Sequence, residues 1–113
     1  MAIPTTSGTG SEATWAIVLT DTENERKIGL GTSECVPDVA ILDPVMVEGM
    51  PPQITADTGM DVLCQAIEGY ASTWGTSMTD GPGLVAARQA FRYLPQAYKE
   101  GSDLEARKEM QNA

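Results

Sequence analysis

The sequence has 113 residues, which is enough for one hydrophobic core and too few for two. Seven Lys and Arg against sixteen Asp and Glu give a formal net charge of −9. Because this charge repels phosphate backbones and anionic bilayers, we expect neither a nucleic-acid nor a membrane partner. The sequence contains no histidine, so it supplies no imidazole for a catalytic triad, for general-base catalysis or for metal binding.

The sequence shows no targeting or membrane-spanning signal. No apolar run approaches the roughly 20 residues of a membrane span, and residues 1–9 lack a basic region followed by an apolar stretch. We therefore expect a cytoplasmic protein. Cys35 and Cys64 form neither a CxxC pair nor a dense disulfide pattern, so we expect two free thiols that are buried or partly buried.

The first half of the chain is rich in Thr, Gly and β-branched residues, which favour strands. Apolar runs at residues 15–20 and 27–30 flank the polar cluster 21–25, a pattern that predicts a hairpin with a loop of five or six residues. Residues 39–42 are apolar at every position, as in a strand covered on both faces, and Asp43-Pro44 ends this run. We expect this third strand to be the most buried.

A long helix is predicted at the start of the second half. Pro51-Pro52 suits a helix start, because the N–H groups that proline lacks would be unpaired there. From Ile54 onward, apolar residues recur at intervals of three and four, which predicts a helix to about Ser72. Gly59 weakens its first half.

Two further helices are expected beyond a loop at residues 73–82. An apolar pattern predicts a helix over 84–101, and Pro95 either kinks this helix or divides it. Either Ser102 or Asp103 can cap a last helix over 104–112. Strands followed by two or three helices predict an α+β fold.

Residues 3–14 have the least ordinary composition, because they combine hydroxyl side chains with two glycines. Gly8, Gly10 and Ala13 match the G-x-G-x-x-A dinucleotide fingerprint. The context argues against it, because too little chain precedes Gly8 for the required strand and a predicted strand follows. Such a loop either binds the hydroxyls or phosphates of a cofactor or forms an ordinary polar turn. Its hydroxyls belong to Thr5, Thr6, Ser7, Thr9 and Ser11.

Asp61 and Gln65 are candidates for a metal site. Their spacing of four puts both on one helix face, where two oxygen ligands could share a cation; the alternative is an ordinary solvated face. Lys27 could reach a phosphate or ribose, or it could be an edge lysine that blunts strand pairing. No two carboxylates are spaced convincingly for acid–base catalysis.

Four sequence blocks, at residues 3–14, 37–44, 50–52 and 58–68, resemble the iron-dependent (group III) alcohol dehydrogenases in order and spacing. Within that family, the likeness is closest to the alcohol dehydrogenase half of bifunctional aldehyde-alcohol dehydrogenases. The resemblance implies an α+β fragment from the middle third of such a protein. Residues 1–50 would then end an NAD(P)-binding α/β domain, and residues 51–113 would begin an all-helical metal domain.

The same resemblance implies roles for individual residues. It makes Asp61 a ligand of Fe²⁺ or Zn²⁺ and places Gln65 where the family pattern has its first ligating histidine. An amide oxygen is a weaker ligand than an imidazole nitrogen, so we expect weak or absent metal binding. The resemblance also places seven residues on the nicotinamide side of an NAD(P) site: Pro4, Thr5, Thr6, Ser7, Gly8, Thr14 and Lys27.

The function implied is the interconversion of a small alcohol and its aldehyde by hydride transfer to or from NAD(P). We expect the isolated chain to be inactive and to bind its cofactors weakly. Helices that normally pack inside a larger domain need a cover for their apolar faces, so we also expect a homo-oligomer. The alternative is a small, independently folding oligomeric protein, derived from that family, with a binding or assembly role.

Overall fold

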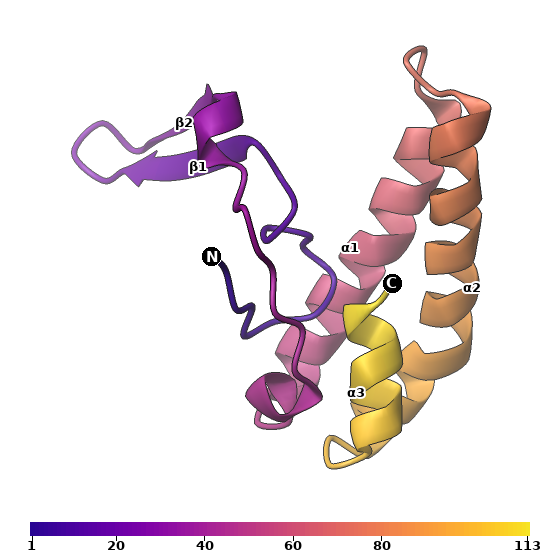
Figure 1. Ribbon diagram of the computed structural model, residues 1–113. Helices are drawn as coiled ribbons and strands as arrows, with labels where there is room; N and C mark the ends of the chain where they lie inside the picture. The colour runs from indigo at the N-terminus through magenta and orange to yellow at the C-terminus, as the bar shows by residue number, and fades with distance from the viewer. The chain divides into compact units, whose positions relative to one another are not determined.

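The computed structural model describes all residues from Met1 to Ala113 and contains two strands followed by three α-helices (Figure 1). This content confirms the predicted α+β class. The chain forms two compact units. We call residues 1–4 and 10–41 the hairpin unit and residues 5–9 and 42–113 the helical unit, and we describe each by itself.

The hairpin unit is built on two antiparallel strands, β1 (Ala16–Asp21) and β2 (Arg26–Gly31). The hairpin is as predicted, but its loop has four residues rather than five or six, because Asp21 and Arg26 still pair across the strands. A short 3-10 turn, η1 (Ser33–Cys35), follows β2.

The Asp21 carboxylate organises the hairpin loop. Its oxygens accept hydrogen bonds from the backbone N–H of Asn24 at 3.1 Å, from Asn24 Nδ2 at 2.9 Å and from Arg26 Nε at 3.3 Å. Glu25 completes the loop in the left-handed region, at φ 49°. The hydrogen bonds from Asn24, first its side chain and then its backbone, lower the pKa of Asp21 below its ordinary value.

We predict that acid loosens this loop. Because the pKa of Asp21 is lowered in the folded hairpin, its contribution to stability is complete above the unfolded-state pKa and is lost as the pH falls through the folded value, below about pH 4. An NMR titration should show the Asn24 amide resonances shifting in that range. Asp21→Asn, which cannot titrate, should abolish the shift; a shift that persists in this variant would contradict the prediction.

The prediction of a third strand at residues 39–42 is wrong. The structure has only one isolated parallel bridge there, between Ala2 and Ala40, held by two backbone hydrogen bonds. Val39, Ile41 and Leu42 are exposed. A run that is apolar at every position needs a cover on both faces and partner strands along both edges, and within the hairpin unit only Ala2 pairs with this segment.

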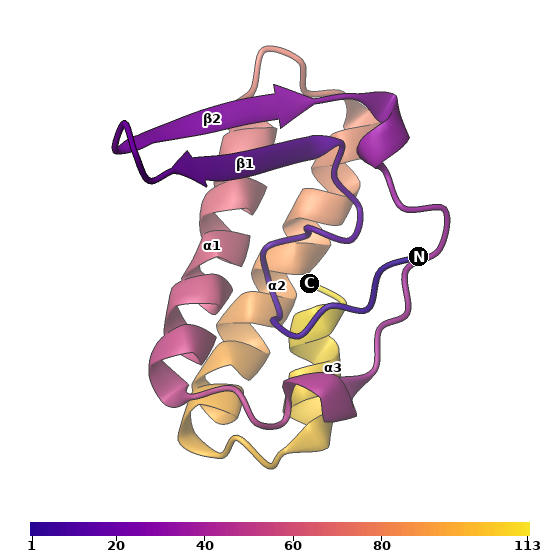
Figure 2. The same cartoon turned by 90° about the vertical axis from the view of Figure 1, so that its left-hand side faces the viewer.

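The helical unit contains α1 (Pro52–Ala71), α2 (Ser77–Lys99) and α3 (Leu104–Gln111), preceded by the 3-10 turn η2 (Pro44–Val47). Helices α1 and α2 run antiparallel and side by side, and α3 packs beside the C-terminal part of α2 (Figures 1 and 2). The core consists of small and medium side chains: Val62, Leu63, Ala90, Ala97, Ala106 and Met110. No helix combines the length and apolar content needed to cross a bilayer.

The helix predictions hold except at the start of α2. Helix α1 has the expected bounds. Of the two caps considered for α3, Asp103 is the one used, and its carboxylate accepts from the Ala106 N–H at 3.0 Å. Helix α2 begins seven residues earlier than predicted, because Thr76 and Thr79 form a capping box. It then continues through Pro82 and Pro95 without a break.

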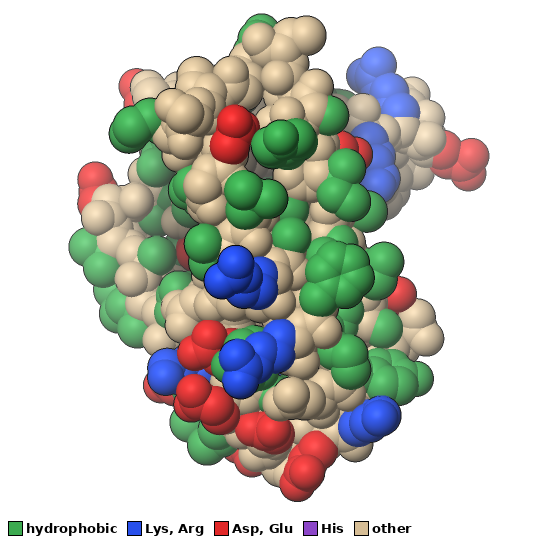
Figure 3. Space-filling view, turned by 90° about the vertical axis from the view of Figure 1, so that its right-hand side faces the viewer, with side chains coloured by type: hydrophobic (Ala, Val, Ile, Leu, Met, Phe, Trp, Pro, Cys, Tyr) green, Lys and Arg blue, Asp and Glu red, His purple; other side chains and the backbone are tan.

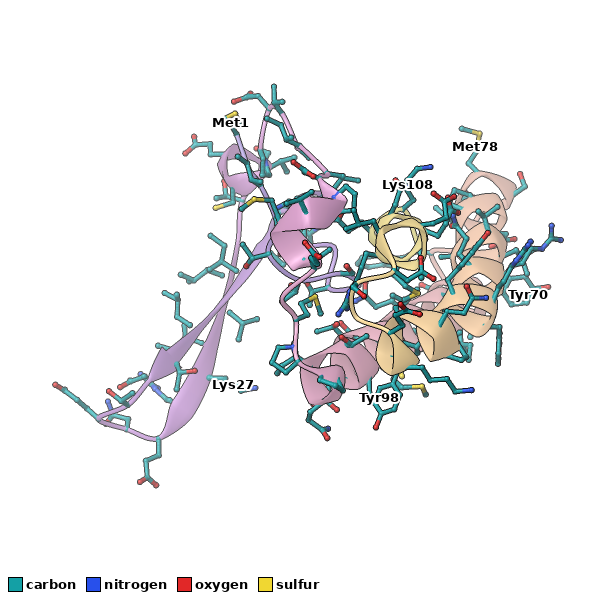
Figure 4. All side chains as sticks on the ribbon, turned by 90° about the horizontal axis from the view of Figure 1, so that it is seen from below. Met1, Lys27, Tyr70, Met78, Tyr98 and Lys108 are labelled. Carbon is teal, nitrogen blue, oxygen red and sulfur yellow. The ribbon has the colours of Figure 1, made fainter.

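The helices carry more apolar side chains than their core buries. Several side chains on the predicted apolar stripes are exposed: Met60, Ile67, Tyr70, Leu84, Val85, Phe91 and Tyr98. Figure 3 shows hydrophobic side chains spread over this face, and Figure 4 shows Tyr70, Met78 and Tyr98 pointing away from the helices. The core of the helical unit therefore covers only part of the predicted apolar stripes.

Gly59 lets α1 and α2 approach each other, because a methyl group there would overlap the side chain of Leu94. We predict that Gly59→Ala destabilises the helical unit by about 1 kcal/mol, since this overlap outweighs the gain in helix propensity. Gly69→Ala is a matched control on the same helix with open space around the added methyl group, and it should stabilise by up to about 1 kcal/mol. Urea unfolding followed by circular dichroism measures both; equal shifts in the two variants would contradict the prediction.

Candidate functional site

The hydroxyl-rich loop at residues 5–9 packs on helix α1 within the helical unit. Gly8 has φ +117°, and a side chain there would overlap the carbonyl oxygen of Thr58 and press on Val62. Ser7 is only 5% exposed, and its Oγ has no hydrogen-bond partner. Glycine is therefore required at position 8 for the loop to lie this close to the helix backbone.

Gln65 connects this loop to Asp61. Its Nε2 lies 2.8 Å from Asp61 Oδ2 and 3.3 Å from the backbone carbonyl oxygen of Gly8. Both neighbours are acceptors, so electrostatics favour the amide orientation that directs the NH₂ group at them. The prediction that Asp61 and Gln65 share a helix face is confirmed, and the structure brings the loop to the same place.

These residues do not fit an iron ion. Asp61 offers one carboxylate, and the side-chain nitrogen of Gln65 occupies one of its oxygens. Divalent iron and zinc are held by several imidazole, thiolate or carboxylate ligands, and the chain has no histidine. No group of three or more His, Cys, Asp or Glu side chains is placed to hold a metal ion.

The seven predicted cofactor residues are divided between the two units. Four of them, Thr5 to Gly8, lie in the helical unit, whereas Pro4, Thr14 and Lys27 belong to the hairpin unit. Thr14 Oγ1 accepts from the Ala16 N–H at 3.1 Å, which helps to start β1. Lys27 lies on β2 opposite Thr20 and is exposed (Figure 4).

The loop at residues 5–9 carries accessible hydroxyl groups but lacks the context of the dinucleotide fingerprint. Thr5 is exposed and Thr6 is half-buried, so both residues can present their hydroxyl groups as hydrogen-bond donors and acceptors. The glycine fingerprint lacks its context, because Gly10, at φ +61°, leads through a turn into β1 rather than into a helix. Gly10 serves a turn, and Gly8 serves the close approach of the loop to α1.

Arg107 is the residue of the helical unit that the sequence analysis missed. It is 1% exposed, and its guanidinium donates only to oxygens of the chain itself. The available signal was its position on α3, one residue after the buried Ala106 and three before the buried Met110. An arginine on the buried face of a short helix indicates a structural hydrogen-bonding role.

The two cysteines are free thiols, as predicted. Cys35 is half-buried, whereas Cys64 is exposed on α1, so the expectation that both are at least partly buried is wrong for Cys64. The reason is the narrow core of the helical unit, which covers Leu63 but leaves the next residue outside.

Family models match most of the chain. The model for iron-containing alcohol dehydrogenase matches residues 1–44, and the model for the C-terminal part of the Fe-containing alcohol dehydrogenase family matches residues 55–113. The second match alone covers more than half of the sequence.

Curated relatives are similar along the whole chain. The 1-propanol dehydrogenase PduQ of Citrobacter freundii is 50% identical over all 113 residues, which make up 30% of that protein. The aldehyde-alcohol dehydrogenase of Streptococcus pneumoniae serotype 4 is 44% identical over 113 residues, which make up 13% of its length. The chain thus spans 30% or less of these two relatives.

Solved structures share the fold. The sulfoacetaldehyde reductase from Bifidobacterium kashiwanohense, solved in complex with NAD⁺, matches with a TM-score of 0.93 and 45% identity over 97% of this chain and 29% of its own. A 1,3-propanediol oxidoreductase matches with a TM-score of 0.92 and 41% identity over 98% of this chain and 29% of its own.

Proposed function

This chain belongs to the iron-containing alcohol dehydrogenase family, and from that premise we propose that it is part of the catalytic apparatus of an NAD(P)-dependent alcohol dehydrogenase. Residues 1–50 would end the cofactor-binding domain, and residues 51–113 would begin the helical metal domain. The reaction is the interconversion of an alcohol and an aldehyde by hydride transfer.

The contact made by Gln65 carries this proposal. It brings the loop at residues 5–9, with its hydroxyls, next to the Asp61 carboxylate on one face of α1. A nicotinamide cofactor, when bound, supplies or accepts the hydride. The loop hydroxyls of Thr5 and Thr6 would hold its ribose and carboxamide, and the relative solved with NAD⁺ supports this cofactor class.

The substrate class follows from the relatives. Those reported above are named for 1-propanol, 1,3-propanediol and sulfoacetaldehyde, so we assign this chain a small alcohol or aldehyde. Because Asp61 and Gln65 do not make an iron site, no chemical step is assigned to a metal here.

We expect the isolated chain to be inactive. Its loop at residues 5–9 offers hydroxyls but no backbone cradle for the diphosphate, so calorimetry should show millimolar or absent binding of NAD⁺ and NADP⁺. Oxidation of short alcohols, with Fe²⁺ or Zn²⁺ added, should be undetectable. Robust turnover, or micromolar binding that is lost in both Thr6→Ala and Lys27→Ala, would overturn this expectation.

A chimera tests the proposed function directly. Residues 1–113 would replace the matching segment of the Citrobacter freundii 1-propanol dehydrogenase, to which the chain is 50% identical. The chimera should bind NAD⁺ as its parent does, and Thr6→Ala in it should weaken binding about tenfold, the effect of losing one well-placed hydrogen bond. A folded chimera whose NAD⁺ affinity is unaffected by Thr6→Ala would argue against the assignment of the loop.

Exposed apolar side chains favour a second candidate function, that of a small oligomeric binding or assembly protein. Phe91 is 74% exposed and Ile67 is 65% exposed on the helical unit, and a second copy of the chain could cover them. Light scattering should then show a dimer or larger species that Phe91→Ser shifts toward monomer. A stable monomer at tens of micromolar would contradict this candidate function.

A further inference from the structure

The geometry of α1 points to a role for Gln65 that is distinct from metal binding: its side-chain amide is a latch that positions the loop at residues 5–9 against the Asp61 carboxylate. Gln65 would thus be a positioning residue. This inference rests on contacts within the helical unit and does not require the dehydrogenase activity proposed above.

The latch uses the hydrogen-bonding inventory of an amide. A glutamine NH₂ group has two N–H bonds, and here one acceptor is available for each: Asp61 Oδ2 at 2.8 Å and the Gly8 carbonyl oxygen at 3.3 Å. The shorter contact is charge-assisted and fixes the amide, and the longer one joins residues that lie 57 positions apart in the sequence. The side chain thereby connects a loop to a helix.

Beside the Gln65 contact, Ser7 and Gly8 add no side-chain hydrogen bond of their own. Gly8 contributes no side chain, and Ser7 is buried without a hydrogen bond for its hydroxyl, which costs stability rather than adding to it. The close approach of Gly8 to Thr58 and Val62 sets the distance between loop and helix. The Gln65 hydrogen bond also restricts the orientation of the loop, because a hydrogen bond depends on angle as well as distance.

The same contact argues against a metal-ligand role for Gln65. A metal ion at this position would require the amide oxygen to face it and the NH₂ group to turn away, which breaks the bonds to Asp61 and Gly8. An amide oxygen is a weak ligand for transition metals, so the metal–oxygen bond would compensate little for the two lost hydrogen bonds. The hydrogen bond between Gln65 and Asp61 therefore holds these two side chains together without a cation.

Helix α1 provides a matched control in Gln53 and Asp57. Gln53 Nε2 donates to Asp57 Oδ1 at 2.8 Å, so the chemistry and the spacing of four are the same as in the pair Gln65 and Asp61. Both glutamines are exposed. The two glutamines differ in one respect: of the two, only Gln65 also contacts the loop at residues 5–9.

The first test measures loop motion in the full chain by NMR. Gln65→Leu should lower the heteronuclear NOE of Gly8 and speed amide exchange in residues 5–9 by about three- to tenfold, as expected for loss of one hydrogen bond. Gln53→Leu should leave both unchanged. Gln65→Lys, which keeps an N–H donor of similar reach, should restore the slow exchange, whereas Gln65→Glu, which faces Asp61 with a second carboxylate, should not.

The second test uses Co²⁺ as the metal probe. The wild-type chain and Gln65→Leu should show equal, weak Co²⁺ binding by calorimetry and visible absorption, whereas Gln65→His, which supplies an imidazole, should bind at least about tenfold more tightly. The inference is overturned if Gln65→Leu leaves the loop as rigid as in the wild type, if Gln53→Leu loosens it equally, or if wild-type Co²⁺ binding is lost in Gln65→Leu.

Discussion

Replacing Arg107 with methionine should destabilise the helical unit by about 3–5 kcal/mol, the largest effect expected of any single substitution in this chain. The side chain is 1% exposed and donates four hydrogen bonds. Methionine fills a similar volume but donates none. Thr55 Oγ1 and the Met50 carbonyl, whose bonds to Arg107 are buried, would then lose this donor.

The partners of Arg107 come from three parts of the helical unit. Nη1 donates to Thr55 Oγ1 on α1 at 2.8 Å, Nε donates to the Gly101 carbonyl between α2 and α3 at 2.9 Å, and Nη2 donates to the Met50 carbonyl at 3.0 Å. The Glu48 carbonyl lies at the limit, 3.5 Å from Nη2. One guanidinium therefore joins the segment before α1, the start of α1 and the turn before α3.

The charge of Arg107 is balanced by dipoles rather than by a hydrogen-bonded carboxylate. Burial lowers the pKa of the guanidinium below its ordinary value, and the charge of Glu48 partly opposes this shift. Carbonyl oxygens satisfy the planar fork geometrically, which lysine cannot reproduce with its single ammonium group. Arg107→Lys should therefore recover only part of the loss and remain about 2 kcal/mol less stable than the wild type.

Urea unfolding followed by circular dichroism measures these differences. Arg88→Met is the control, since Arg88 is exposed on α2, and its effect should stay within about 0.5 kcal/mol. If Arg107→Met unfolds completely, Arg107→Lys still gives a measurable midpoint. A loss below 1 kcal/mol in both Arg107 variants would mean that solvent replaces the guanidinium, contrary to its burial.

Local sequence patterns predicted most of the secondary structure. Polar residues between two apolar runs gave the hairpin, and the spacing of three and four from Ile54 gave α1 almost to the residue. The pair Ser102 and Asp103 indicated the start of α3, because an N-cap acts on amides within three residues of it. The early start of α2 was missed because the capping box of Thr76 and Thr79 lies in a Gly- and Ser-containing stretch that reads as a loop.

Burial was harder to predict, because it depends on what each segment packs against. The run at residues 39–42 has the composition of a covered strand, yet only a single bridge to Ala2 forms there. On the helices, the apolar stripe includes Ile67 and Phe91, which are exposed, while the core is built from alanines that a hydrophobic pattern ranks lower. A pattern identifies the face that seeks cover but not whether cover is present.

In the candidate site, too, local spacing was predictable and packing was not. Spacing alone placed Asp61 and Gln65 on one face, because residues four apart are neighbours on any helix. The contact of Gln65 with Gly8 crosses 57 residues and depends on how the loop packs, so no local pattern could predict it. The family resemblance pointed to the loop and to the helix separately. The structure shows the hydrogen bond from Gln65 to Gly8 that connects them.

Gly8→Ala should detach the loop at residues 5–9 from α1, at a cost of about 2 kcal/mol or more. Two independent effects combine. At φ +117° an L-residue is strained wherever it lies, and the new methyl group would overlap the Thr58 carbonyl oxygen, which belongs to the helix backbone and cannot rotate away. Because the helix is held by its own hydrogen bonds, the loop must move instead.

The consequence extends to the proposed cofactor loop, and this makes the variant informative. Gly49→Ala is the control, since Gly49 lies in the same unit with open space around the added methyl group and should change stability by less than about 0.5 kcal/mol. In Gly8→Ala, the Gln65 side chain loses its loop partner, so its amide resonances should shift while those of Gln53 do not. If Gly8→Ala leaves stability and the Gln65 resonances unchanged, the loop does not lie on α1, and its hydroxyls and the Asp61 carboxylate do not form one site.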